Sequence, residues 1–388
     1  QKLIRNGCKI SYKDLEGEYG WKLEDDELYE GDLVIIDDSL NLNGHKLTVT
    51  GDIVHIGGNI EINGGQLICK GNYRQQARVM QDGEYVYTQG SSILCMNNED
   101  DRVVVYGDYI TESIAQQNGY MTDGTLEVYG NIETVGEAKT SFCASDKHTL
   151  KLKGEKKQKI SFNHSGYQDS KISNLIIDNP EGIEIDDSVY VSGNIHDISK
   201  NVKGNIEIGD NTVFENETFS GGIAVKSGVK YSKNIRIQGG LYLSGVLTLS
   251  GKIEVNGDIN AESYSGITMD NGQLTTNGNF NMSGWVSRGI VMSNAEDYIK
   301  IAGDFNYSPY WDGTFSNGIL EIGGNFNAGA FYGRDNHKVI LSGTKLQTIT
   351  FDNINSYFNV IELKNHSDEG IYSDKVFKKK KLIKNGCR

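Results

Sequence analysis

Leu126-Glu127-Val128-Tyr129-Gly130-Asn131-Ile132 returns later in the chain as Leu320-Glu321-Ile322-Gly323-Gly324-Asn325-Phe326, at an offset of 320 − 126 = 194 residues. Each copy alternates apolar and polar residues and then has a glycine, an asparagine and another apolar residue. Such alternation places apolar side chains on one face of a β-strand. Glycine and asparagine both tolerate a positive φ, so the Gly-Asn pair predicts a sharp turn between two strands.

The turn motif, glycine followed by Asp or Asn and an apolar residue, recurs along the chain. In the second half its spacings are 278 − 257 = 21, 303 − 278 = 25 and 324 − 303 = 21 residues. A strand with one buried face needs a neighbour on each edge, and stacked windings of this length supply those neighbours. We therefore predict an all-β fold, a parallel β-helix (β-solenoid) with coils of about 20–25 residues. The motif occurs at Gly31-Asp32, Gly51-Asp52, Gly71-Asn72, Gly107-Asp108, Gly130-Asn131, Gly257-Asp258, Gly278-Asn279, Gly303-Asp304 and Gly324-Asn325.

Two longer repeats enclose this short one. Residues 96–103 align without a gap on residues 292–299, and Lys2-Leu3-Ile4-Arg5-Asn6-Gly7-Cys8 returns as Lys381-Leu382-Ile383-Lys384-Asn385-Gly386-Cys387 after 381 − 2 = 379 residues. The 379-residue repeat predicts that this chain is one period of a tandem array. The expected organisation is a cap or inter-module joint over 1–30, a first solenoid half over 31–190, irregular connecting coils over 191–240, a second solenoid half over 241–365 and a linker into the next copy over 366–388.

Composition excludes several classes of function. The formal net charge of −14 disfavours a nucleic-acid partner, which needs clustered Lys and Arg. The one basic run, Lys378–Lys381, is interpreted as a solvated linker. No stretch approaches the ~20 apolar residues of a transmembrane helix, and any export signal or anchor is expected outside this sequence.

The five cysteines show no zinc-site spacing. Cys69, Cys95 and Cys143 are interpreted as small hydrophobic residues of the interior. Cys8 and Cys387 hold equivalent places in the terminal repeat, which leaves a disulfide between modules open.

Several segments resemble the repeat region of large surface-associated β-solenoid proteins of Gram-positive bacteria of the clostridial and paenibacillus type. The similarity covers roughly residues 30–365 and is carried by residues 42–51, 63–67, 122–128 and 337–343. The resemblance implies an extracellular right-handed β-helix and supplies no catalytic motif. A looser likeness to pectate-lyase-type β-helices concerns architecture alone.

Two acidic turns are the candidate calcium sites. Asp100 and Asp101 follow Asn97 and Asn98, and the equivalent pair Glu296 and Asp297 follows Asn294. Carboxylate and amide oxygens are the ligands that calcium prefers, but the fixed spacing of a recognised calcium loop is absent. A structural turn is the favoured alternative, and acid/base catalysis by these pairs is the remaining one. His45, His148 and His337 precede strands and are interpreted as hydrogen-bonded corner residues.

An aromatic cluster, Tyr307, Tyr310, Trp311 and Phe315, is the candidate glycan-binding site. Aromatic rings with polar edges stack on the faces of sugars, and solenoids place binding residues on long loops. The competing interpretation is a loop that these rings hold against the coil.

Together these features predict a structural or adhesive module of a tandem-repeat extracellular surface protein or filament. No enzyme activity and no cofactor are predicted, with calcium left open. The expected partners are neighbouring copies of the same module, head to tail, and surface glycan. A glycan-binding module is the alternative, and a polysaccharide lyase or hydrolase of the β-helix type is a more distant one.

Overall fold

The computed structural model of this 388-residue chain describes residues 20–385 apart from residues 77, 82–83, 88–91, 114–116, 137, 286–287, 311–312 and 374–375. All regular elements among them are β-strands, and no helix occurs in this part of the chain. The strands stack in parallel as a β-solenoid of about 16 turns, which confirms the predicted fold class. The chain divides into a first unit, Gln1–Gly204 with Asn211–Glu215, and a second unit, Asn205–Asp210 with Asn216–Arg388.

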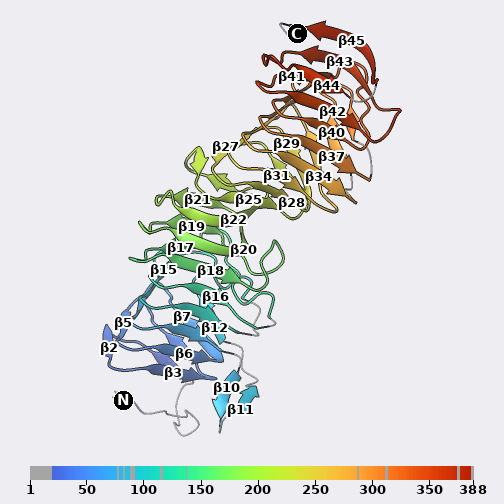
Figure 1. Ribbon diagram of the computed structural model, residues 1–388. Coiled ribbons are helices and arrows are strands. Elements are labelled where there is room, and N and C mark those ends of the chain that lie inside the picture. The colour runs from blue at the N-terminus through green and yellow to red at the C-terminus, as the bar shows by residue number, and fades with distance from the viewer. Residues whose placement is uncertain are drawn as a thin grey trace. The chain divides into compact units, whose positions relative to one another are not determined.

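Each winding of the first unit adds strands to two or three parallel sheets (Figure 1). A four-stranded sheet contains β1 (Trp21–Lys22), β4 (Leu40–Asn41), β7 (Gly58–Glu61) and β12 (Ser92–Cys95). A nine-stranded sheet contains β2 (Glu27–Tyr29), β5 (Lys46–Val49), β8 (Gln66–Cys69), β13 (Arg102–Val105), β15 (Thr125–Val128), β17 (Thr149–Leu152), β19 (Asn174–Ile177), β21 (Asn194–Asp197) and β23 (Val213–Phe214). The remaining parallel strands are β3 (Leu33–Ile36), β6 (Ile53–Ile56), β9 (Tyr73–Gln75), β14 (Tyr109–Thr111), β16 (Ile132–Thr134), β18 (Gln158–Phe162) and β20 (Ile183–Val191). β10 (Arg78–Gln81) and β11 (Glu84–Tyr87) form an inserted antiparallel hairpin.

The second unit repeats this three-sheet arrangement. A five-stranded sheet contains β26 (Val229–Tyr231), β29 (Val246–Leu249), β32 (Gly266–Met269), β35 (Gly289–Met292) and β38 (Thr314–Phe315). A nine-stranded sheet contains β24 (Thr218–Phe219), β27 (Asn234–Ile237), β30 (Lys252–Val255), β33 (Gln273–Thr276), β36 (Tyr298–Ile301), β39 (Ile319–Ile322), β41 (Lys338–Leu341), β43 (Tyr357–Leu363) and β45 (Lys378–Lys384). The third ladder contains β25 (Gly222–Val225), β28 (Leu241–Leu243), β31 (Ile259–Ala261), β34 (Phe280–Gly284), β37 (Phe305–Pro309), β40 (Phe326–Ala328), β42 (Gln347–Phe351) and β44 (Ile371–Ser373). β22 (Val202–Ile208) holds residues of both units.

A column of buried aliphatic residues fills the interior of each unit. The first column places these residues opposite one another in successive windings: Leu47, Leu67, Val103, Leu126, Leu150, Leu175 and Ile195. The second consists of Ile235, Ile253, Leu274, Ile299, Leu320, Val339 and Ile361. Each fully buried aliphatic side chain stabilises the fold by about 1.5–3 kcal/mol relative to an exposed one. The predicted aliphatic ladders are therefore present in both units.

The Asp and Asn residues of the turn motif connect successive windings at one corner. In the first unit the backbone N–H of Asp52 donates to Asp32 Oδ1 at 2.8 Å, and that of Asn72 donates to Asp52 Oδ1 at 2.6 Å. The series continues through Asp108 and Asn131 at 2.8 and 2.7 Å. In the second unit the same bond is made by Asn279, Asp304, Asn325 and Thr348, at 2.7–2.9 Å. We call this series the corner ladder.

The glycine of the motif has a different role from the one that the sequence suggests. Gly303 and most of its equivalents do not have a positive φ; Gly31, at +95°, is an exception. A Cβ on Gly303 would instead lie 2.4 Å from Asn279 Oδ1 and 2.7 Å from the carbonyl oxygen of Gly278. The expectation of left-handed backbone at this corner is thus wrong, because the constraint is the close approach of the winding beside it.

Positive φ values occur at another corner. Asn43 and Gly44 have φ values of 51° and 82°, and Asn63 and Gly64 have values of 46° and 78°. Two consecutive positive values are typical of the tight turns that Asn-Gly pairs favour. Glycine is therefore needed for a positive φ at Gly44 and Gly64, and not at Gly303 and most of its equivalents.

Coil length varies around the predicted 20–25 residues, and two of the predicted boundaries need correction. Partner residues in the nine-stranded sheets are from 253 − 235 = 18 to 103 − 67 = 36 residues apart, and the longest winding contains the hairpin β10–β11. Residues 21–29 of the predicted cap already form β1 and β2, which pair with β4 and β5. The predicted linker over 366–388 contains β44 and β45, which pair with β42 and β43, because Leu382 lies opposite Ile361 and extends the aliphatic column.

We expect Gly303→Val to lower the free energy of unfolding by about 2 kcal/mol or more, because the added side chain overlaps the neighbouring winding. The matched control is Ser308→Val on the exposed face of β37, which should change stability by less than about 0.5 kcal/mol. Urea unfolding of both variants measures the difference. Equal midpoints would contradict a close-approach role for Gly303.

Candidate functional site

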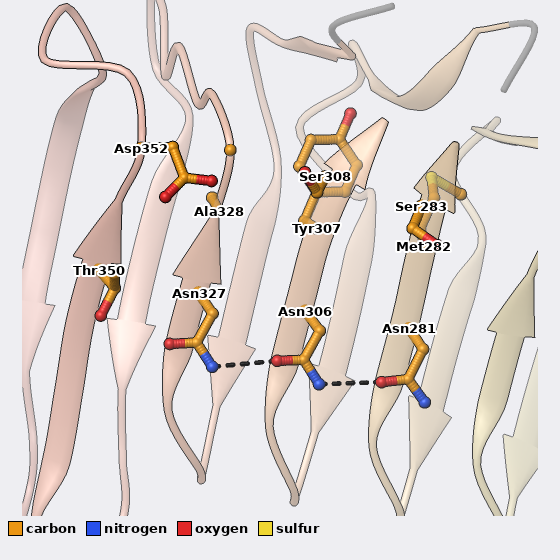
Figure 2. A pocket seen from close by; sticks show the side chains of 11 residues that line it. Asn281, Met282, Ser283, Asn306, Tyr307, Ser308, Asn327, Ala328, Thr350 and Asp352 are labelled. Atoms are coloured by element: carbon orange, nitrogen blue, oxygen red, sulfur yellow. Dashed lines mark hydrogen bonds between the residues drawn. The ribbon is translucent and has the colours of Figure 1, made fainter. Parts of the chain in front are cut away.

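A groove of about 300 Å³ lies on the surface of the second unit, across strands β34, β37, β40 and β42. Figure 2 shows its lining from close by. Amide, hydroxyl and carboxyl groups from four successive windings line it together with apolar groups, and the lining residues are Asn281, Met282, Ser283, Asn306, Tyr307, Ser308, Asn327, Ala328, Gly329, Thr350 and Asp352. The volume lies at the small end of the range for ligand sites.

A row of asparagine side chains forms one wall of the groove. Asn281 Nδ2 donates to Asn260 Oδ1 at 2.9 Å, Asn306 Nδ2 to Asn281 Oδ1 at 2.9 Å and Asn327 Nδ2 to Asn306 Oδ1 at 3.0 Å. Thr350 lies opposite Asn327 on the next strand (Figure 2). We call Asn260, Asn281, Asn306 and Asn327 the asparagine row, of which the last three line the groove.

The row stands on a rigid interior. Strand alternation turns the residues on either side of each asparagine inward, so that Phe280, Phe305 and Phe326 are all buried. Their rings pack in sequence with centroids 5.5 and 5.2 Å apart. Aromatic pairs in this range stabilise a core beyond the area that they bury. The polar wall therefore has little freedom to rearrange.

Beside the groove two exposed aromatic rings stack on each other. Trp285 and Tyr310 have ring centroids 4.3 Å apart at an interplanar angle of 19°, and each is 62% exposed. Trp285 follows the groove residue Ser283 by two positions, and Tyr310 follows Ser308 by two. The backbone N–H of Tyr310 donates to Gly284 O at 2.8 Å and fixes the two windings relative to each other. We call Trp285 and Tyr310 the aromatic pair.

The predicted glycan cluster is only partly at the surface. Tyr307 and Phe315 are each 1% exposed and pack against each other in the interior at 5.7 Å, so they cannot present a ring face to a sugar. They fall on inward positions of β37 and β38, whereas the sequence assigned all four rings to one loop. Tyr310 is exposed, as a binding residue must be, and Trp311 lies outside the described residues.

Sequence reasoning missed Trp285 and the asparagine row, although both leave a signal. Trp285 and Tyr310 are 310 − 285 = 25 residues apart, which equals the spacing of the turn glycines Gly278 and Gly303. The asparagines of the row each follow a turn-motif Asp or Asn by two residues. Alignment of whole windings, rather than of the turn motif alone, reveals both features.

The acidic turns are built around two buried carboxylates. Asp101 accepts hydrogen bonds from the backbone N–H groups of Asn97, Asn98 and Gly64 at 2.7, 3.0 and 2.6 Å. Asp100, next to it, is exposed. The three bonds satisfy amide groups from two windings, so Asp101 holds the turn together.

The equivalent turn of the second unit has the same construction. Asp297 accepts from Ser293, Asn294 and Asn271 at 2.8, 2.9 and 2.8 Å, and Glu296 is exposed. Within the described residues no group of three or more His, Cys, Asp or Glu side chains is placed to hold a metal ion. The predicted calcium residues thus divide into a buried structural carboxylate and an exposed acid at each turn.

Asp297→Ala should lower the free energy of unfolding by about 3 kcal/mol or more, because three backbone N–H groups lose their acceptor. Glu296→Ala is the matched control at the adjacent exposed position, and we expect a change within about 0.5 kcal/mol. Thermal and urea unfolding measure both variants. A control as destabilised as Asp297→Ala would exclude the structural role of the buried carboxylate.

The candidate histidines occupy different environments. His148 and His337 are fully or nearly fully buried, and burial lowers the pKa of each to about 4. His337 Nδ1 lies 2.8 Å from Asn317 O, whereas both ring nitrogens of His148 lack a partner among the described residues. His45 is half-buried, with Nδ1 3.9 Å from Asp26 Oδ1. The predicted hydrogen-bonded corner role therefore fits His337 and not His148.

Buried neutral histidines make stability depend on pH. The pKa of His148 is about 4 when folded, against an ordinary value of 6.5, so the unfolded chain binds the proton first as the pH falls. The resulting loss of stability develops between pH 6.5 and pH 4 and reaches about 3 kcal/mol, at about 1.4 kcal/mol per pKa unit. His148→Leu should reduce this slope, as measured by urea unfolding at several pH values. An unchanged slope would rule out this contribution.

Cys69 and Cys143 are buried free thiols, and Cys95 is half-buried. Burial raises the pKa of Cys69 and Cys143 to about 11 and that of Cys95 to about 12. Such thiols are poor nucleophiles, which suits the predicted packing role. Cys8 and Cys387 lie outside the described residues.

Comparison with protein family models, curated proteins and solved structures found no match. A separate search of the described segments for membrane-spanning helices found no helix of sufficient length and apolarity. The functional argument therefore depends on the groove, the asparagine row and the aromatic pair.

Proposed function

We propose that the chain is an adhesive module of a secreted, tandem-repeat surface protein or filament, in which the solenoid is the scaffold and the groove of the second unit binds glycan. Its location would be extracellular or on the cell surface. Parallel windings suit such a scaffold, because each is joined to the next by backbone hydrogen bonds and by the corner ladder. A scaffold of this kind holds a shallow site with both apolar and polar lining groups in a fixed shape.

The observation that carries the proposal is the aromatic pair beside the groove. Trp285 and Tyr310 expose most of their side chains, although exposing large apolar groups to water is energetically unfavourable. Flat aromatic surfaces stack on the C–H faces of sugar rings and tolerate an aqueous edge. The adjacent amides and hydroxyls offer donors and acceptors for sugar hydroxyl groups. Apolar rings beside a polar wall are the combination that an uncharged oligosaccharide requires.

The number of carboxylates that line the groove favours glycan binding over glycan hydrolysis. Glycoside hydrolysis generally uses two carboxyl groups that flank the scissile bond. Among the described lining residues, Asp352 is the only carboxylate. One carboxylate can accept hydrogen bonds from sugar hydroxyls but does not provide both catalytic roles. A lyase or hydrolase is therefore the weaker alternative, and we propose a module without enzyme activity or cofactor.

The double variant Trp285→Ala/Tyr310→Ala should weaken binding to an uncharged glycan selected on a glycan array. We expect at least a tenfold loss of affinity, equivalent to about 1.4 kcal/mol. Calorimetry with the selected oligosaccharide measures the loss. The reason is removal of the stacking surface, while the buried interior beneath the groove is unaffected.

The matched control for that experiment is Tyr167→Ala, which removes another exposed aromatic side chain from the first unit. It should leave affinity unchanged, and melting temperatures of all variants verify folding. If the double variant binds as tightly as the parent chain, or if no glycan is bound by the parent, the glycan proposal fails and the aromatic pair only joins two windings.

A further inference from the structure

We propose that Tyr264 is a third ligand-contacting residue beside the aromatic pair, and that the ligand is an unbranched, uncharged oligosaccharide that lies along successive windings. This choice of ligand depends on the proposed function, because it assumes that the groove binds glycan. Tyr264 is 76% exposed, and Trp285 and Tyr310 are each 62% exposed. We call these three residues the aromatic series.

Tyr264 holds the same place in its winding as the two members of the aromatic pair. Ile259, Phe280 and Phe305 lie opposite one another in β31, β34 and β37. Each residue of the aromatic series follows one of them by five positions, since 264 − 259 = 5, 285 − 280 = 5 and 310 − 305 = 5. Three successive windings therefore expose an aromatic side chain after the same strand.

Hydrogen bonds hold these three segments side by side. The backbone N–H of Tyr264 donates to Trp285 O at 2.7 Å, and that of Tyr310 donates to Gly284 O at 2.8 Å. A Cβ on Gly284 would lie 3.6 Å from Oγ of Ser263, the residue before Tyr264. Tyr264 and Tyr310 thus belong to the windings on either side of Trp285.

Tyr264 has a backbone conformation that is unfavourable for a tyrosine. Its φ is 68°, in a turn that the hydrogen bond from Ser265 N–H to Glu262 O closes at 3.1 Å. Glycine or asparagine is the usual third residue of a turn where φ is positive. Among the described non-glycine residues with a positive φ, seven of nine are Asn or Asp, and Tyr264 is the one aromatic residue.

The turn therefore does not explain why a tyrosine is present. Left-handed backbone is disfavoured for a residue with a Cβ, and most of this side chain contacts water rather than the interior. Strained backbone of this kind is concentrated where side chains bind ligands. Contact between Tyr264 and a ligand would account for both its strain and its exposure.

The length of the aromatic series indicates the length of the ligand. Phe331 follows Phe326 by 331 − 326 = 5 residues and is only 1% exposed, so the series ends before the next winding. Val246, which follows Leu241 by 246 − 241 = 5 residues, has no ring in the winding before Tyr264. With neighbouring strands ~4.8 Å apart, the first and third windings of the series are about 10 Å apart. This distance exceeds one sugar ring, so a chain of sugars is needed to contact all three residues.

The groove extends in the same direction as the aromatic series. Asn281, Asn306 and Asn327 of its wall belong to successive windings, and Asn260 of the asparagine row belongs to the winding of Tyr264. A sugar chain along the windings would meet amides of the row and rings of the series together. A chain across the windings would reach the groups of fewer windings.

The lining favours a chain without charge. Among the described lining residues there is no Lys or Arg, and Asp352 is the single carboxylate. An anionic glycan would meet this carboxylate without a cation to offset the repulsion. The hydroxyl groups of neutral sugars instead find donors and acceptors in the amides and hydroxyls of the groove.

Calorimetry with unbranched oligomers of glucose, mannose and N-acetylglucosamine, from dimers to hexamers, tests the assignment. We expect the hexamer of the preferred sugar to bind about fivefold or more tightly than the dimer, because it reaches a further ring. Tyr264→Asn should remove this gain and leave the affinity for the dimer unchanged. Its melting temperature should equal or exceed that of the parent chain, because Asn tolerates a positive φ. Tyr264→Phe is the matched control, which keeps the ring and should bind the hexamer like the parent chain.

The double variant Trp285→Ala/Tyr310→Ala distinguishes failure of this proposal from failure of the proposed function. If the double variant loses binding at every length while Tyr264→Asn binds the hexamer like the parent chain, the groove binds glycan and Tyr264 has no part in it. Equal affinities of the parent chain for dimer and hexamer, or a preference for branched glycans, would likewise exclude the linear ligand. A lower melting temperature of Tyr264→Asn, with equal loss of affinity at every length, would make the ring a structural residue. A parent chain that binds no glycan overturns both proposals.

Discussion

The hydrogen bond from a backbone N–H to the Asp or Asn side chain of the preceding winding is the constraint on which the rest of the structure depends. It occurs at the same corner of successive windings, with acceptors from Asp32 to Asn131 in the first unit and from Asp258 to Asn325 in the second. The bond fixes the height and rotation of each winding. Since a slip of one residue would turn the aliphatic column outward, register at the corner determines what the interior buries.

The corner ladder also explains the glycines. The accepting side chain occupies the space that a Cβ of the next winding would need, as the 2.4 Å distance at Gly303 shows. The Gly-Asp or Gly-Asn pair therefore acts across windings. The glycine leaves room for the Asp or Asn side chain of the preceding winding, and the Asp or Asn of the pair accepts the hydrogen bond from the following winding. This reciprocity accounts for the persistence of the pair while the residues between the corners vary.

The fold could be predicted from sequence because period-two alternation and a recurring turn motif are local signals. The candidate site could be predicted only in part. Tyr307 and Phe315 appeared to share a loop with Tyr310, but strand alternation, which depends on where β37 begins and ends, sends them inward. Trp285 lies one winding away from Tyr310, so no short segment of sequence contains both. The basic run of β45 was interpreted as a linker because four successive lysines are typical of solvated segments. Leu382, which continues the aliphatic column, is a single apolar residue beside them.

The asparagine row has a direction. Each Nδ2 donates to the Oδ1 of the winding before it, so all of the amide dipoles point the same way along the groove. The two ends of the row are therefore chemically different, with an amide donor at Asn260 and a carbonyl acceptor at Asn327. An oligosaccharide, whose reducing and non-reducing ends also differ, would meet unequal partners in its two orientations. The scaffold thus gives the groove an intrinsic polarity with respect to a chain-like ligand.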